Sequence, residues 1–153
     1  MRPLVFAGNW KMNVGPVEAR EYLRAFFAAG EIPHERSVWF FPPTVSIGAV
    51  AQGIAGHRNV QAGAQDIYWE AKGAFTGATS GALAKQAGAR LTLIGHSERR
   101  HVFGETDEQT GKKVAWQELG EGFRDRKFRF QILDEGEYQD QDWHDDLKKI
   151  LDS

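Results

Sequence analysis

The chain has 153 residues, a formal net charge of −2, 41% hydrophobic residues and no cysteine. This length suffices for one domain with a sizeable core, so we expect a single domain over residues 1–153. The nearly balanced charge offers no basic surface for nucleic acid or an anionic membrane, and the lack of cysteine excludes a disulfide scaffold. No apolar run approaches the roughly 18 residues of a membrane span, and the N-terminal run is too short for a signal peptide. We therefore expect a soluble, cytoplasmic protein.

Short apolar runs alternate with helical patterns along most of the chain. The apolar runs predict strands at residues 4–7, 38–41, 59–64 and 90–94, and the strand at 4–7 is expected to be buried. Apolar residues at helical spacing predict helices at 17–29, from a cap at Thr44 or Ser46 to Ile54, at 80–86 and at 107–119. Thr106 and Gln109 form a capping box for the last of these helices. Strand-helix units in series favour a parallel sheet with right-handed crossovers, which makes the fold class α/β.

Residues 65–79 form a long, Gly-rich connection that carries Tyr68, Trp69 and Phe75. A loop of this length inside a compact domain is uncommon and is usually functional. Its aromatic residues either pack within the loop or contact another chain, because exposed aromatic patches mark interaction sites. The sequence leaves both interpretations open.

The pattern changes after Gly122. Residues 127–133 alternate apolar and polar side chains, which predicts a strand with one face in water. Asp142 then suits the N-cap of a helix, because apolar residues follow it at helical spacing. We expect residues 123–153 to form a strand-helix cap over an edge of the sheet.

Polar side chains follow the first and the fourth predicted strands. Residues 8–13 read Gly-Asn-Trp-Lys-Met-Asn, and residues 95–100 read Gly-His-Ser-Glu-Arg-Arg. Parallel α/β folds gather their active-site groups at the carboxyl ends of the strands. We therefore expect both runs to contribute to a site at that edge.

Five motifs, in order, resemble the triosephosphate isomerase family over residues 4–115; they lie at 7–13, 63–66, 73–77, 94–100 and 104–108. The resemblance implies a (β/α) half-barrel, or an open, mostly parallel sheet of about five strands derived from a TIM barrel, because a full barrel needs about 250 residues. It divides the domain into a (β/α)4 part at 1–122 and an unrelated strand-helix tail at 123–153. It also implies interconversion of triose phosphates through an enediolate, with no cofactor and no metal.

The resemblance assigns chemical roles to four residues. His96 resembles the neutral histidine that acts as electrophile, and a short helix starting near Ser97 would favour its neutral form. Lys11 resembles the lysine that stabilises charge on the substrate and the enediolate, and Asn9 the amide that helps to position it. Glu98 resembles a carboxylate near that lysine. Lys11 and Asn9 would bind the substrate, a triose phosphate.

By the same resemblance, Thr76 is the tip that the family's long loop inserts beside the active site of a partner subunit, which implies a homodimer. Phe75 and Trp69 would belong to the same contact. Structural explanations exist beside these. His96 alone would be a satisfied structural histidine, Lys11 a solvated surface lysine, and residues 98–100 a salt-bridged turn.

After Ala115, no stretch resembles the family's catalytic glutamate with its lid or the glycine-rich loops that bind phosphate. Without them a site lacks both the proton acceptor and most substrate binding. Three hypotheses follow. The first is a scaffold, either a natural truncation or an engineered chimera, that has no isomerase activity by itself. The second is a triosephosphate isomerase that is active on assembly, and the third is a module that binds a phosphate ligand without turnover. The well-patterned tail favours the scaffold.

Overall fold

The structure is a computed structural model, and it describes residues 4–119. Two expectations fall outside the described residues. They are the strand predicted at 127–133, needed for a sheet of about five strands, and the helix predicted from Asp142. The elements alternate along the chain. They are β1 (Leu4–Asn9), α1 (Pro16–Ala28), β2 (Arg36–Phe41), η1 (Thr44–Ser46), α2 (Ile47–Gly53), β3 (Val60–Ala64), α3 (Gly81–Gln86), β4 (Leu91–Thr92), α4 (Ser97–His101) and α5 (Asp107–Leu119).

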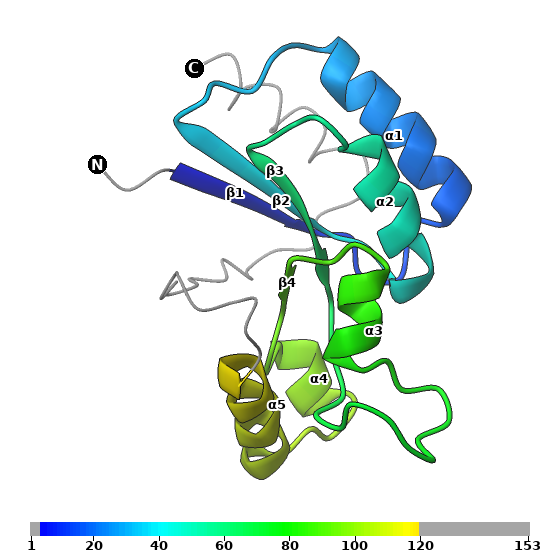
Figure 1. Ribbon diagram of the computed structural model, residues 1–153, viewed down its shortest axis with the longest axis vertical. Helices are drawn as coiled ribbons and strands as arrows, with labels where there is room; N and C mark the ends of the chain where they lie inside the picture. Colours follow the sequence, from blue (N-terminus) through cyan, green and yellow to red (C-terminus); the bar gives the residue numbers. More distant parts are fainter. Residues whose placement is uncertain (1–3, 120–153) are drawn as a thin grey trace.

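The four strands form a parallel sheet in the order β1-β2-β3-β4. Each strand pairs with the next one along the chain, and α1, α2 and α3 all lie on one side of the curled sheet (Figure 1). This arrangement is the predicted α/β half-barrel. The parallel pairing follows from the strand-helix repeat, because a helix between two strands returns the chain to the same end of the sheet.

Helices α1 and α2 enclose an apolar core against the sheet. At its centre Trp10, Tyr22, Phe26 and Phe40 pack with ring centroids between 5.2 and 6.0 Å apart. Such aromatic pairs each contribute about 0.5–1.5 kcal/mol beyond the area they bury. The core extends through further buried residues on α1, α2, β2 and β3: Ala19, Leu23, Val38, Ala49, Val50, Val60 and Ala62.

The strand ends differ from the sequence prediction. β1 continues two residues past Ala7 and ends at Asn9, whereas β4 comprises only Leu91–Thr92. The expectation that residues 4–7 form a buried strand is wrong, because Leu4 is 57% exposed and Ala7 is exposed as well. The physical reason is that β1 pairs with a single described strand, β2, and the helices within residues 4–119 cover one of its faces.

Two predicted helix caps have different outcomes. The capping box of α5 is confirmed: Gln109 Oε1 accepts from the N–H of Thr106 at 3.0 Å, and Thr106 Oγ1 accepts from the N–H of Gln109 at 3.2 Å. Ser46 occupies the predicted N-cap position of α2, but its side chain makes no capping hydrogen bond, and Thr44 begins η1 instead of capping a helix. The Ser46 hydroxyl instead donates to the carbonyl of Val14 at 2.8 Å and ties α2 to the loop before α1.

Candidate active site at the carboxyl edge of the sheet

The parallel sheet brings polar groups from separate strands to one edge. Asn9 ends β1, Gln65 follows β3 directly, and His96 follows β4 as the residue before α4. Lys11 lies two residues beyond β1, and Glu98 lies in the first turn of α4. The carboxyl ends of parallel strands share one edge, so these five residues meet there although they are far apart in sequence.

His96 is buried, with 7% of its surface exposed, and occupies the N-cap position of α4. Its Nδ1 accepts a hydrogen bond from the backbone N–H of Glu98 at 3.2 Å. A ring nitrogen that accepts a hydrogen bond carries no proton, so we assign a neutral imidazole with its proton on Nε2. The backbone N–H at the start of α4 thus selects the tautomer of His96.

The Nε2 side of His96 faces the amide of Asn9. Asn9 Oδ1 accepts the backbone N–H of Lys11 at 3.0 Å, which turns the amide nitrogen toward the imidazole. Nδ2 of Asn9 lies 3.3 Å from Nε2 of His96. In the assigned tautomer both of these nitrogens are donors, so neither satisfies the other. Two converging donors form a place for an acceptor oxygen.

Lys11 has a strained backbone, with φ at 51° in the left-handed region. Such a conformation costs about 1–3 kcal/mol in a non-glycine residue and persists only where the surroundings hold it. Here Asn9 accepts its N–H, and Gln65 Nε2 donates to its carbonyl at 2.7 Å. The Lys11 ammonium lies 3.0 Å from Glu98 Oε1, so these two residues form an ion pair beside His96.

Sequence reasoning gave Gln65 no role, although it lies within one of the family-like motifs. In the structure its Nε2 also donates to the carbonyl of Phe41 at 2.8 Å, and one amide thus ties the ends of β1 and β2 together. Its position in the sequence could have indicated this role, because a polar residue directly after a predicted strand lies at the same edge of the sheet as Asn9 and His96.

A second cluster adjoins this site and is called the charge ring here; it consists of Asp66, Arg99, Glu105 and Lys113. Lys113 Nζ lies 2.6 Å from Asp66 Oδ1 and 2.6 Å from Glu105 Oε2. Arg99 reaches the same two carboxylates, at 3.3 Å and 3.4 Å. The side chains of Lys113 and Glu105 are only 4% and 2% exposed. The ring has two positive and two negative groups, and this balance makes such burial possible.

The ring keeps Glu105 ionised. Burial raises the pKa of Glu105, but the hydrogen bond and charge of Lys113, with hydrogen bonds from Thr110 and Arg99, outweigh burial and hold the pKa below its ordinary value. Thr110 Oγ1 donates to Glu105 Oε1 at 3.1 Å. The salt-bridged turn considered for residues 98–100 is therefore only part of the arrangement, since Arg99 belongs to the ring while Glu98 pairs with Lys11.

The loop at 65–79 extends away from this edge (Figure 1). Residues 71–78 are all exposed, Thr76 among them, and Phe75 is 41% exposed. The ring of Tyr68 lies 4.1 Å from Trp69 and 4.5 Å from Phe75, centroid to centroid. The aromatic residues thus pack on one another within the loop, while its tip presents no buried side chain.

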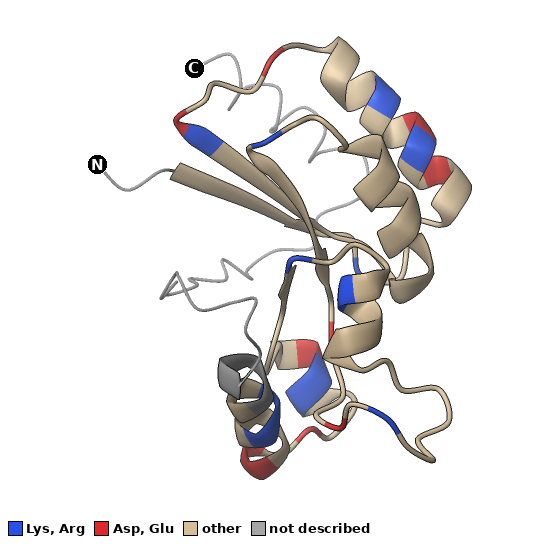
Figure 2. Ribbon diagram, viewed as in Figure 1, with Lys and Arg blue, Asp and Glu red and all other residues tan. Residues whose placement is uncertain are grey.

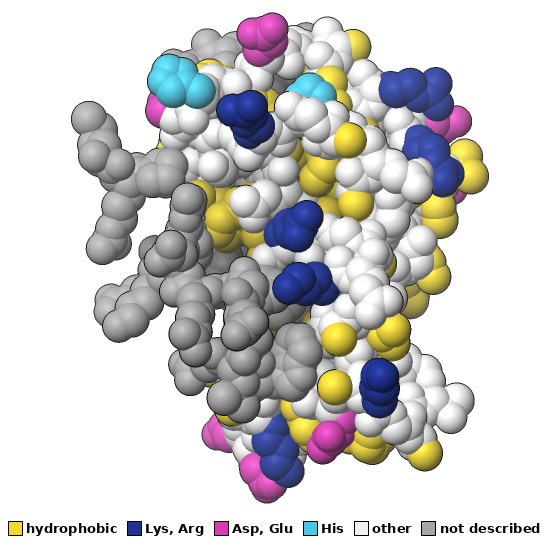
Figure 3. Space-filling model, viewed as in Figure 1, with side chains coloured by type: hydrophobic (Ala, Val, Ile, Leu, Met, Phe, Trp, Pro, Cys, Tyr) yellow, Lys and Arg dark blue, Asp and Glu magenta, His cyan; other side chains and the backbone are white. Residues whose placement is uncertain are grey.

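Other site types have less support in the described part of the chain. Within residues 4–119, no group of three or more His, Asp or Glu side chains could hold a metal ion. Across the same residues, no helix has the length and apolar character needed to cross a membrane. Lys and Arg side chains lie scattered over the face seen in Figure 3, separated by hydrophobic and uncharged ones.

The fold and this edge define a class: a parallel (β/α) half-barrel with a neutral histidine, a lysine and an amide at the carboxyl ends of its strands. Sequence comparison narrows the class, because the family model of triosephosphate isomerase matches residues 4–119. The chain belongs to the triosephosphate isomerase family.

Individual relatives agree with this assignment. The chain is 42% identical over 115 residues to triosephosphate isomerase from Acaryochloris marina, and this match covers 74% of this chain and 47% of that protein. It is 44% identical over 115 residues to the enzyme from Trichormus variabilis, with the same coverage. The enzyme from Acidithiobacillus ferrooxidans is 44% identical over 114 residues, 74% of this chain and 44% of that protein. The chain thus spans about half the length of these curated relatives.

Proposed function

We propose that this chain supplies the electrophilic half of an isomerase site for triose phosphates and does not turn the substrate over by itself. The observation that carries the proposal is the pair of donors at the sheet edge, His96 Nε2 and Asn9 Nδ2, 3.3 Å apart. The Lys11 ammonium lies at the same edge and is paired with Glu98, whose carboxylate also approaches His96 Nδ1. Fixed donors beside a cation stabilise an oxygen atom on which negative charge develops.

The chemistry that suits these donors is enolisation. A base removes a proton from the hydroxyl-bearing carbon next to a carbonyl group. The electron pair of the broken C–H bond forms a C=C bond, and the π pair of the C=O bond moves onto the carbonyl oxygen. That oxygen accepts hydrogen bonds from His96 and Asn9, and Lys11 offsets its charge. The proton of the hydroxyl group then passes to that oxygen, and the base returns its proton to the former carbonyl carbon. The hydroxyl-bearing carbon thereby becomes the new carbonyl, and ketose and aldose are exchanged.

The group that this chemistry still needs is the base. Among the described residues, Glu98 is the carboxylate in contact with His96, and it lies on the Nδ1 side while the donor pair lies on the Nε2 side. Its carboxylate is also paired with Lys11. No stretch of the printed sequence after Ala115 resembles the family's catalytic glutamate or its phosphate loops. These observations support a scaffold that is inactive alone.

A coupled isomerase assay on the purified chain, with glyceraldehyde 3-phosphate or dihydroxyacetone phosphate, tests this proposal. We expect no turnover above buffer. Turnover that disappears in His96→Gln and in Lys11→Ala, but persists in the exposed-lysine control Lys85→Ala, would overturn the inactivity and favour the enzyme that is active on assembly. Activity that rises more steeply than protein concentration would point to the same alternative.

The preformed donor pair also favours the third hypothesis, a module that binds a phosphate ligand without turnover. Phosphoglycolate, whose carboxylate imitates the enediolate, is a suitable probe for calorimetry or NMR titration. We expect weak binding that both His96→Gln and Lys11→Ala abolish. Equal binding of inorganic phosphate and phosphoglycolate would show that the donor pair does not recognise the carboxylate.

We further propose a homodimer formed through the loop at 65–79. The exposed tip with Thr76, and Phe75 at 41% exposure, support it, because an exposed aromatic at a loop tip suits insertion into a partner. Light scattering after size exclusion should give twice the chain mass, and Phe75→Ser should shift it toward the monomer. A monomer at all concentrations would contradict the proposed dimer.

We also propose that the protein works in the cytoplasm, because a chain without cysteine suits a reducing compartment.

A further inference from the structure

The charge ring lies next to the proposed site but takes no part in its chemistry. Two residues anchor Lys11 on this side: Gln65 donates to its carbonyl, and Glu98 pairs with its ammonium. Each of these anchors is followed in the sequence by a member of the ring: Asp66 follows Gln65, and Arg99 follows Glu98.

The ring connects segments that no strand pairing joins. Asp66 belongs to the turn after β3, Arg99 to α4 and Lys113 to α5. Arg99 links the first two directly, with Nη2 at 3.3 Å from Asp66 Oδ2, and Lys113 closes the circuit through Asp66 and Glu105. The backbone adds one more tie, because the N–H of Glu105 donates to the carbonyl of Arg99 at 2.9 Å.

We propose that the charge ring, closed by Lys113, positions the candidate site by fixing the Gln65–Asp66 turn against α4. Lys113 is then a positioning residue that reaches neither His96 nor Lys11 itself. The inference rests on the proposed function, because it concerns the geometry of that same site.

Because the charge ring is largely buried, its stability depends on every charge keeping its partner. When one partner of a buried ion pair is removed, the remaining charge is left without compensation, and the structure rearranges to hydrate it. Without the ammonium of Lys113, Asp66 and Glu105 share only the guanidinium of Arg99, which holds them at longer distances. The turn after β3 and the start of α4 are then joined through Arg99 alone and can shift relative to one another, and the N–H that fixes the His96 tautomer moves with α4.

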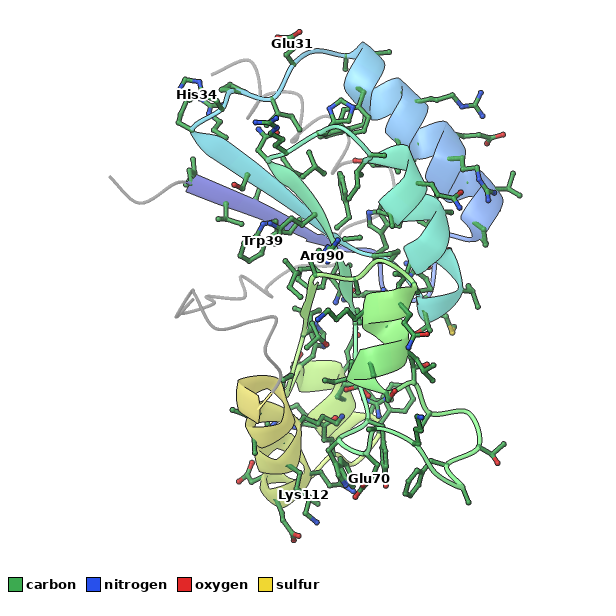
Figure 4. All side chains as sticks on the ribbon, in the orientation of Figure 1. Glu31, His34, Trp39, Glu70, Arg90 and Lys112 are labelled. Atoms are coloured by element: carbon green, nitrogen blue, oxygen red, sulfur yellow. The ribbon has the colours of Figure 1, made fainter. Side chains whose placement is uncertain are left out.

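The chain provides a matched control in the neighbouring residue. Lys112 has the same side chain and lies on the same helix, but 49% of it is exposed, and its partner is Glu108 at 2.8 Å, one helical turn away. Figure 4 shows Lys112 of α5 close to Glu70 of the 65–79 loop, and its ammonium lies 5.5 Å from the centroid of the Trp69 ring in that loop. Its removal takes away an equal charge without touching the ring.

The experiment compares Lys113→Met with Lys112→Met in the full chain by nitrogen NMR of the histidine rings. In the wild type and in Lys112→Met we expect His96 to show an unprotonated Nδ1 and a protonated Nε2. In Lys113→Met we expect a mixture of tautomers, and phosphoglycolate binding that is weaker by up to about 100-fold, the loss that a displacement of aligned groups by about 1 Å causes in a reaction rate. A folded Lys113→Met with an unchanged His96 spectrum and unchanged binding would overturn the proposal.

Should Lys113→Met fail to fold, Asp66→Asn opens the ring at a more accessible point, since the Asp66 side chain is 28% exposed. The same His96 readout then decides. A double variant, Lys113→Met with Asp66→Asn, restores the charge balance but not the geometry, and we expect it to recover stability while the tautomer mixture remains. Recovery of the tautomer together with stability would show that charge balance alone matters, and would overturn positioning by the ring.

The two proposals fail in different ways. If the wild type binds no phosphoglycolate, the proposed function fails, yet the His96 tautomer still reports whether Lys113 sets the geometry. If the wild type binds and Lys113→Met binds equally well with the same tautomer, the proposed function stands and the positioning role fails.

Discussion

Two regions of this half-barrel are held together by different forces. In the first region, β1 to β3 with α1 and α2, most buried apolar side chains form one cluster, and a smaller cluster joins Ile47 and Ala64 to Ile67, Ala84 and Ala89. In the second, α4 buries no residue fully, and the buried charged side chains are Glu105 and Lys113 (Figure 2 shows the charges on α4 and α5). Apolar packing is non-directional and supplies stability, whereas buried ion pairs require defined geometry. The first region is suited to hold the fold, and the second to place groups accurately.

The candidate site spans both regions. Asn9 and Lys11 come from the apolar region, while His96 and Glu98 come from the charged one. Gln65 lies at the boundary and hydrogen-bonds to the first region through the carbonyls of Lys11 and Phe41. Variants that damage one region and spare the other therefore test whether the division is real.

The largest effect is expected in the apolar region. Phe40 is 1% exposed and touches Trp10, Tyr22 and Phe26, so Phe40→Ala leaves a cavity and should lower the free energy of unfolding by about 4 kcal/mol. Urea denaturation measures it. Leu83→Ala is the exposed control, at 54% exposure, and should change little. A loss in Phe40→Ala as small as in this control would contradict the role of the aromatic core.

The next effect is expected at the charge ring. Glu105→Gln keeps the shape of the side chain but leaves Lys113 with Asp66 alone, which should cost about 3 kcal/mol. Hydrogen exchange should show the loss first in α4 and α5, and only later in α1. The control Glu108→Gln removes an equal charge from an exposed pair. Uniform loss of protection over both regions would mean that the two do not differ as described.

The ring should also make the second region sensitive to acid. The pKa of Glu105 is lowered in the folded chain, so below about pH 4.3, the ordinary value in an unfolded chain, the unfolded state binds more protons than the folded one. Its stabilisation is therefore complete above that pH and is lost as the pH falls through the lower folded value. Unfolding measured from pH 7 downward should show this slope, and Glu105→Gln should remove its Glu105 component. An identical slope in both proteins would contradict the assignment.

The smallest effect is expected at the cap of α5. Thr106→Ala removes the hydroxyl that accepts the N–H of Gln109 and should lower stability by about 1 kcal/mol, while Thr106→Ser retains the acceptor and should change little. Thermal unfolding of the two variants measures the difference. Equal losses in both would show that the methyl group, and not the cap, stabilises this end of the helix.

Much of the fold could be predicted from the sequence because its signals are local. Apolar runs gave the four strands, helical spacing gave α1, and Thr106 with Gln109 gave the start of α5. The errors arose where tertiary contacts compete with local preference. Ser46 has the chemistry of a cap, but the carbonyl of Val14 takes its hydroxyl, and residues 4–7 are apolar but pair with one described strand only.

The sequence by itself determined the family and the half-barrel, and it indicated Asn9, Lys11, His96 and Glu98 as candidate site residues, because motifs at strand ends are contiguous and keep their order along the chain. Only the tertiary structure decided that Gln65 holds the strained backbone of Lys11, and that Lys113 closes a ring with Asp66 and Glu105. These contacts join residues 8 to 54 positions apart, and no periodic pattern encodes them. They exist because parallel strands bring their carboxyl ends to one edge, where polar groups that are partly buried must find partners.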